Sequence, residues 1–157
     1  MVRQREASKL LGAHIVGLPR FVLRWVWHLA PKKSLGQRGE DEAARYLRKL
    51  GYRILARGRR LASGELDLVA LDGRTIVFVE VKTRTSQEVG HPADAVDLAK
   101  QRRLTRLAVT FMKRHGLLEF PARFDVVAIT WPAGHGRPTI EHFKNAFEAV
   151  GQQEFYS

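Results

Sequence analysis

Residues 64–84 constrain the fold of this 157-residue chain more than any other stretch. They read GELDLVALDGRTIVFVEVKTR, in which two largely apolar runs flank Asp72 and Gly73. An Asp-Gly pair is a favoured two-residue turn between antiparallel strands. If these two residues form the turn, Leu71 pairs with Arg74. The segment therefore predicts a β-hairpin whose register follows from the sequence.

The hairpin predicts a cluster of charged side chains on one face of the sheet. Side chains alternate between faces along a strand, so three acids and one lysine emerge on an otherwise apolar face: Glu65, Asp67, Glu80 and Lys82. In this register Asp67 faces Phe78 and Glu65 faces Glu80. Asp67 and Glu80 are then diagonal neighbours, with backbone positions about 7–8 Å apart.

Such a cluster favours a bound cation, because like charges are costly to bury unless something neutralises them. Mg²⁺ or Mn²⁺ takes carboxylate and water oxygens and needs no thiolate, and the chain contains no cysteine. Lys82 would lie beside the same ion, where it can orient a metal-bound water and offset charge on a phosphate. The alternative is a solvent-exposed hairpin face on which Glu80 and Lys82 are ordinary surface charges.

A predicted helix supplies another acid. Ser34 and Gln37 have the spacing of a capping box, and the helix that follows ends at Gly51. Its apolar stripe consists of Ala43, Ala44, Leu47 and Leu50. Helical spacing places Glu40 on this inward stripe. Glu40 either faces the hairpin acids or is a first-turn acid that complements the helix dipole.

A second predicted helix, ending at Gly116, carries the basic residues expected to bind nucleic acid. Its core positions are Leu104, Leu107, Ala108, Phe111 and Met112, and its basic side carries Lys100, Arg102, Arg103 and Arg106. The chain has a formal net charge of +11, as expected of a protein that meets a polyanion. Phosphate binding of this kind weakens steeply with salt. The alternative is a solvated face without a partner.

The remaining segments complete an α/β fold with a mixed central sheet of about five strands flanked by helices. YRILAR predicts a short strand before a basic turn, GRRLAS. ARFDVVAITW predicts another strand, and TIEHFKNAF a final strand running into a short helix. Asp125 is interpreted as a structural residue. The six histidines show no paired metal spacing and are interpreted as surface or packing residues.

Residues 1–33 are expected to form a basic, apolar N-terminal extension before a domain over residues 34–150 and a tail over 151–157. Residues 1–35 carry seven basic side chains and one acid. Arg20 and Arg24 argue against a membrane-spanning helix, and a secretory signal also fits poorly. The extension is either an amphipathic segment on a membrane surface or protein partner, or a disordered arm. The absence of cysteine fits a reducing compartment, so we expect a cytoplasmic protein.

The motifs resemble a known superfamily. Asp67 followed by Glu80-Val81-Lys82 resembles the core of the restriction-endonuclease-like, PD-(D/E)xK, nucleases, and a helical Glu such as Glu40 is similar to the acid that archaeal Holliday-junction resolvases add. The ordered motifs GQRGEDEAARYLRKLGYRIL, GELDLVALDG, IVFVEVKTR, GHPADAVDLAKQRRL and RFDVVAI resemble a bacterial family typified by YraN. The match spans residues 34–145, and the preceding extension departs from the family pattern.

This resemblance implies a restriction-endonuclease-like fold in which Glu40, Asp67 and Glu80 bind Mg²⁺ or Mn²⁺. It makes Lys82 the catalytic lysine alongside Asp67 and Glu80, with Glu65 as a supporting acid. The expected function is metal-dependent hydrolysis of DNA, on branched or junction structures. The alternative is a non-catalytic nucleic-acid-binding module with a degenerate nuclease core. A homodimer is compatible with either reading.

Overall fold

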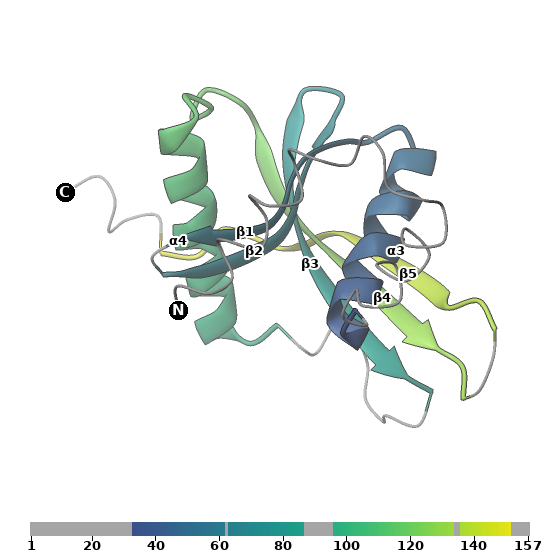
Figure 1. The fold of residues 1–157 in the computed structure, drawn as a ribbon. Helices are drawn as coiled ribbons and strands as arrows, with labels where there is room; N and C mark the ends of the chain where they lie inside the picture. Colours follow the sequence, from purple (N-terminus) through teal and green to yellow (C-terminus); the bar gives the residue numbers. More distant parts are fainter. Residues whose placement is uncertain (1–32, 62, 87–95, 134–135, 152–157) are drawn as a thin grey trace, which may run out of the picture. The chain divides into compact units, whose positions relative to one another are not determined.

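The computed structural model of the chain describes residues 33–61, 63–86, 96–133 and 136–151. In chain order its elements are α3 (Leu35–Lys49), β1 (Arg53–Leu61), β2 (Gly64–Asp72), β3 (Thr75–Thr85), α4 (Leu98–Arg114), β4 (Ala122–Trp131) and β5 (Thr139–Phe147) (Figure 1). The predicted extension and tail lie outside the described residues, apart from Lys33 and Gly151 at their inner ends.

The five strands form one mixed sheet in the order β1-β2-β3-β4-β5. Strands β3 and β4 pair in parallel, and every other neighbouring pair is antiparallel. A parallel pair needs a crossover connection, and α4 lies in the connection between β3 and β4. The predicted α/β fold with a mixed five-stranded sheet is confirmed.

The two helices cover opposite faces of the sheet (Figure 1). The α3 face buries Ala43, Ala44 and Leu47 against Leu68, Ala70, Val77, Val79, Val127 and Ile129. The α4 face buries Leu104, Leu107, Ala108, Phe111 and Met112 against Leu66, Val69, Ile76, Phe78, Phe124 and Val126. The sheet is thus covered on both faces, and all five predicted core positions of the α4 helix are confirmed.

Both helices begin and end where capping chemistry predicts. The Ser34 hydroxyl accepts from the Gln37 backbone N–H at 3.2 Å, and the Gln37 side chain accepts from the Ser34 N–H at 3.0 Å. Gly51 and Gly116 follow the two helices with φ of 89° and 65°, a left-handed conformation that favours glycine. The apolar stripe is one residue shorter than expected, because Leu50 caps α3 and is 49% exposed.

Three predicted boundaries are wrong. The turn of the β2–β3 hairpin is Gly73-Arg74, so Leu71 pairs with Ile76 and not with Arg74. Gly73 alone has a positive φ, 60°, which matches a turn with glycine at its first position. Strand β1 runs through the predicted basic turn to Leu61, because β2 pairs with it throughout. TIEHFKNAF is strand over its whole length, without the predicted short helix.

No helix within the described residues is long and apolar enough to cross a lipid bilayer.

Candidate nuclease-like site

The β2–β3 hairpin brings Asp67 and Glu80 next to each other. The ladder runs as far as the pair Leu68–Val79, and just beyond it the Glu80 charge acts on the Asp67 carboxyl group. The Asp67 carboxylate accepts a hydrogen bond from the Val81 backbone N–H at 2.8 Å. The predicted register is wrong by two residues. A two-residue shift keeps the face of each side chain along the paired part of the ladder, and the charges of the two acids still interact. Beyond the ladder the predicted alternation fails, because Leu66 packs on the α4 face with Val69 whereas Leu68 packs on the α3 face.

Glu80 is buried and paired with two lysines. The residue is only 8% exposed. Oxygen Oε1 of Glu80 lies 3.1 Å from the Lys82 ammonium, which comes from the same strand. The same oxygen accepts a hydrogen bond from Lys100 at the start of α4. The alternative in which Glu80 and Lys82 are ordinary surface charges is therefore wrong for Glu80.

The environment disfavours charge on Asp67. Burial, together with the nearby Glu80 carboxylate, raises the pKa of Asp67 to about 7, although the hydrogen bond from Val81 opposes this. Burial also lowers the pKa of the Lys82 ammonium, and the adjacent Lys100 lowers it further. Burial opposes the charge of Lys100 as well, but its hydrogen bonds to Glu80 and Lys82 and the charges of Glu80 and Asp67 together outweigh that effect and raise its pKa.

Glu40 and Glu65 form a second acidic pair beside the first. A side chain built at Gly58 would lie 3.3 Å from a Glu65 carboxylate oxygen and 4.0 Å from one of Glu40, so both acids lie close to this point of β1. Burial and the Glu65 charge raise the pKa of Glu40, and Glu40 in turn raises the pKa of Asp67. Glu40 lies beyond the first turn of α3, so its interpretation as a helix-dipole acid is wrong.

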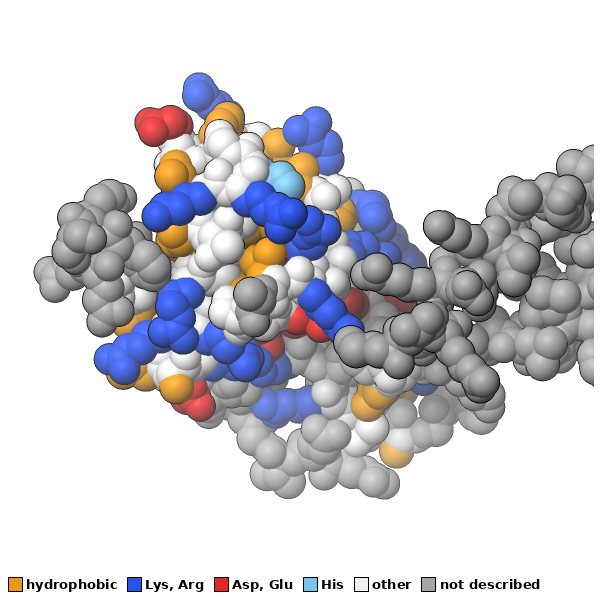
Figure 2. Space-filling view, turned by 60° about the vertical axis from the view of Figure 1, so that its left-hand side comes forward, with side chains coloured by type: hydrophobic (Ala, Val, Ile, Leu, Met, Phe, Trp, Pro, Cys, Tyr) orange, Lys and Arg blue, Asp and Glu red, His pale blue; other side chains and the backbone are white. Residues whose placement is uncertain are grey.

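The α4 side of the site is basic. Arg102, Arg103 and Arg106 are exposed, as predicted. Figure 2 shows Lys and Arg side chains spread over the molecular face to which α4 contributes, with a small acidic patch among them. The Arg103 side chain lies against Gly64 at the start of β2, next to Glu65. Basic side chains thus adjoin the acidic cluster on this face.

Sequence reasoning misses the position of Lys100. It places Lys100 on the nucleic-acid-binding face, whereas the structure places its ammonium on Glu80 inside the acidic cluster. A feature of the sequence could have indicated this position of Lys100. A crossover helix between parallel strands runs back along the sheet, so its first turn lies near the carboxyl end of the preceding strand. Asp97, which caps α4 by accepting from the Lys100 backbone N–H at 2.7 Å, fixes Lys100 in that turn.

The donor set fits a small hard cation, with Asp67 and Glu80 as its first two ligands. Mg²⁺ is commonly held by one or two carboxylates and keeps several waters. A divalent cation would also offset the two charges that burial makes unfavourable here. Among the described residues, no three His, Cys, Asp or Glu side chains already stand around one point. Glu40 acts on Asp67 through its charge but does not stand with Asp67 and Glu80 around one point.

A second buried acid is neutralised within the protein. Asp125 of β4 is fully buried and accepts from Arg123 at 3.0 Å and from the Asn145 backbone N–H at 2.9 Å. His142 Nε2 lies 2.9 Å from its other oxygen. Arg123 also donates to the Tyr52 hydroxyl. Burial acts to raise the pKa of Asp125, but these hydrogen bonds outweigh it and hold the pKa below its usual range. This geometry agrees with a structural interpretation of Asp125.

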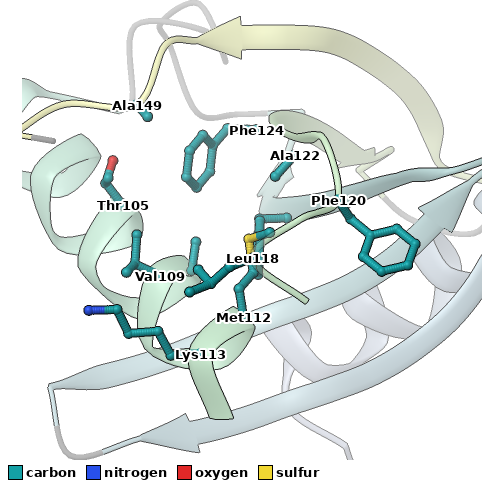
Figure 3. A pocket seen from close by; sticks show the side chains of 11 residues that line it. Thr105, Val109, Met112, Lys113, Leu118, Phe120, Ala122, Phe124 and Ala149 are labelled. Carbon is teal, nitrogen blue, oxygen red and sulfur yellow. The ribbon is translucent and has the colours of Figure 1, made fainter. Parts of the chain in front are cut away.

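A cavity beside α4 is apolar and separate from the acids. It has a volume of about 270 Å³ and lies between α4 and the turn that follows it. In Figure 3, Thr105, Val109 and Met112 of α4 line it opposite Leu118 and Phe124. None of the candidate site residues contributes to its wall. The candidate chemistry is therefore at the hairpin acids and not in this cavity.

The mixed sheet, its two covering helices and the carboxylate pair at the β2–β3 hairpin are consistent with a restriction-endonuclease-like α/β domain. Within that class, the sequence profile described as "Uncharacterised protein family UPF0102" matches residues 39–129. The chain belongs to this family, which confirms the predicted YraN-like membership.

Relatives from several bacteria support the assignment. A UPF0102 protein of Rhodopirellula baltica is 50% identical over 126 residues, covering 78% of this chain and 75% of the relative. One from Geobacter sulfurreducens is 52% identical over 116 residues, covering 74% and 90% of the two chains. One from Symbiobacterium thermophilum is 49% identical over 117 residues, covering 74% and 98%.

Proposed function

We propose that this protein is a metal-dependent endonuclease that hydrolyses phosphodiester bonds in DNA, with branched or junction DNA as its substrate. The observation that carries the proposal is the buried Glu80 beside Asp67, with the Lys82 ammonium on its carboxylate. A fold gains nothing in stability from gathering like charges on an apolar strand, so such a pair favours a functional explanation. The resemblance to junction resolvases supports the choice of substrate.

In this proposal Asp67 and Glu80 bind Mg²⁺ or Mn²⁺, and Glu40 contributes from α3. When bound, the metal would supply an activated water and stabilise negative charge on the phosphate. Lys82 stays beside Glu80, where its ammonium offsets charge that develops on the scissile phosphate. Glu65, whose carboxylate lies near that of Glu40 at Gly58, is a supporting acid that does not itself bind the metal.

The α4 arginines hold the DNA backbone in this proposal. Arg102, Arg103 and Arg106 are exposed, and arginine is well suited to bind phosphate oxygens. Such interactions position the duplex without reading its sequence. Arg103→Ala and Arg106→Ala should therefore weaken DNA binding and reduce its salt slope by about one for each phosphate that the variant no longer binds.

One observation favours the alternative function, a DNA-binding protein without cleavage. Glu80 already has two lysine partners, and among the described residues three acids do not converge on one point. A degenerate nuclease core would keep its affinity for DNA and show no cleavage with Mg²⁺ or Mn²⁺.

The test is a cleavage assay of the purified chain on four-way, flapped, linear and single-stranded DNA with Mn²⁺. We expect cleavage of branched DNA, and its loss by about 100-fold or more in Glu80→Gln and in Asp67→Asn, while DNA affinity is kept or slightly improved. Glu119→Gln removes an exposed acid in the turn after α4 and is the matched control. Normal cleavage by either site variant, or none by the wild type on any substrate, would refute the endonuclease.

A further inference from the structure

Lys82 and Lys100 both bind the same oxygen, Oε1 of Glu80, but they reach it from different elements. Lys82 lies two residues along β3, and its backbone is paired with Ala128 of β4 inside the sheet. Lys100 extends from the first turn of α4, whose N-terminus is fixed by the Asp97 cap. The backbone of Lys82 thus belongs to the strand that carries Glu80. The backbone of Lys100 belongs to α4, so its side chain can leave Glu80 without any change in that strand.

The Lys100 ammonium lies where a cation shared by the two acids would act. It hydrogen-bonds to Glu80, and its charge also acts on the neighbouring Asp67. A divalent cation held by Asp67 and Glu80 would compete with this ammonium for the same carboxylate oxygens. Lys100 is therefore placed to act as the protein's own counter-ion for the site.

A displaced Lys100 would have a second place to bind. Arg103, three residues further along α4, is a neighbour of Lys100 on the helix surface, because residues i and i+3 are adjacent there. Arg103 is exposed, and its side chain runs beside β2 at the edge of the acidic cluster. An ammonium released from Glu80 would join this basic face, where a DNA phosphate can accept its hydrogen bonds.

We propose that Lys100 couples metal binding to DNA binding: a divalent cation displaces its ammonium from Glu80, and the released lysine then binds a substrate phosphate. This inference rests on the proposed nuclease function. Lys100 is thus a positioning and phosphate-binding residue that competes with the metal for Glu80 and competes less once a DNA phosphate binds it. The coupling is reciprocal, so DNA must tighten metal binding by the same factor by which metal tightens DNA binding.

The experiment compares Lys100→Met with Lys113→Met, which removes the same charge from the last turn of the same helix. Mn²⁺ binding to the full chain is measured by calorimetry without DNA. We expect Lys100→Met to bind Mn²⁺ about 5-fold or more tightly than the wild type, the lower end of typical coupling between sites, because a competitor is gone. Lys113→Met should match the wild type.

DNA binding gives the second readout. Affinity for four-way DNA is measured in chelator and in Ca²⁺, which replaces Mg²⁺ without requiring turnover. Wild type and Lys113→Met should bind DNA about 5-fold or more tightly with Ca²⁺, and Lys100→Met should lose most of this gain. A lysine that merely stabilised the fold would change the melting temperature and leave both metal affinity and coupling unchanged.

The outcomes separate the two proposals. If neither the wild type nor Lys100→Met binds Mn²⁺, the proposed metal-dependent function fails. If the wild type binds Mn²⁺ but Lys100→Met binds it equally or more weakly, the Lys100 inference is overturned and the nuclease proposal stands. Lys100→Gln keeps a hydrogen-bond donor for Glu80 without the charge, and it replaces Lys100→Met in the same measurements if the methionine variant does not fold.

Discussion

Asp125 and Asp67 are both acids on inner strands of one sheet, yet their surroundings are opposite. Asp125 is held by the Arg123 guanidinium, the His142 ring and the Asn145 backbone N–H, and its pKa is lowered. Asp67 accepts from Val81 but lies against the Glu80 carboxylate, and its pKa is raised to about 7. The fold stabilises one charge and leaves the other destabilised.

The difference indicates that Asp125 stabilises the fold, whereas Asp67 is placed to bind a ligand. A buried charge that is fully paired resists removal, because its partners would be left without theirs. A buried charge facing another of the same sign costs the metal-free protein stability, and a bound cation would recover that cost. The same substitution of Asp by Asn should therefore have opposite effects at the two positions.

The largest effect is expected for Asp125→Asn. The substitution keeps the shape of the side chain but removes the buried charge that contacts Arg123 and His142. Breaking a buried ion pair by neutralising one partner costs about 3–5 kcal/mol, so we expect a loss of that order in the free energy of unfolding. Urea unfolding at pH 7 measures it. A loss below about 1 kcal/mol would mean that the Asp125 network is not the structural centre of β4 and β5.

The pH dependence follows from the same residue. The native pKa of Asp125 is below its unfolded value, so its stabilisation is complete above about pH 4 and is lost as the pH falls through the native pKa. We therefore expect the stability difference between wild type and Asp125→Asn to narrow by about 1–2 kcal/mol between pH 5 and pH 3. Urea unfolding of both proteins across this range tests it, and a constant difference would contradict it.

Asp67→Asn should change stability in the opposite direction. In chelator, the substitution removes a half-buried charge that interacts unfavourably with that of Glu80, and the asparagine oxygen can still accept from the Val81 N–H. We expect the free energy of unfolding to rise by about 1 kcal/mol or more, because the raised pKa of Asp67 means that the fold disfavours its charge. Asp125→Asn in the same urea series is the control. A decrease in both variants would remove the contrast between the two acids.

The sequence predicts much of the fold because its local rules agree. The Ser34 capping box, the glycines after both helices and the α4 core spacing each depend on neighbours a few residues away, and all are confirmed. The hairpin turn is misplaced because Asp72-Gly73 and Gly73-Arg74 both suit a two-residue turn. Pairing along the whole ladder, which the sequence does not show, selects between them.

The candidate site is only partly predictable for a related reason. Asp67 and Glu80 lie on neighbouring strands of one short hairpin, so they stay close together despite the register error. The contact between Lys100 and Glu80 depends on where α4 crosses the sheet, and the Glu40–Glu65 pair depends on the path of β1 at Gly58. These are contacts between elements, and periodicity within one element carries no information about them.

The smallest effect is expected for Glu40→Gln, and the response of this variant to metal tests whether Glu40 belongs to the metal site. Burial and the Glu65 charge disfavour an ionised Glu40, so neutralising it in chelator should preserve the free energy of unfolding or raise it by a few tenths of a kcal/mol. Glu42→Gln is the matched control, since Glu42 pairs with Arg45 on the outer side of the same helix and its loss should cost a similar amount.

In millimolar Mg²⁺ the wild type and Glu42→Gln should gain the same increase in melting temperature, because a ligand that binds the native state stabilises by mass action. Glu40→Gln should gain less, because its site binds the ion more weakly. Equal metal shifts in all three proteins would place Glu40 outside the metal site and leave Asp67 and Glu80 as its only protein ligands within the described part of the chain.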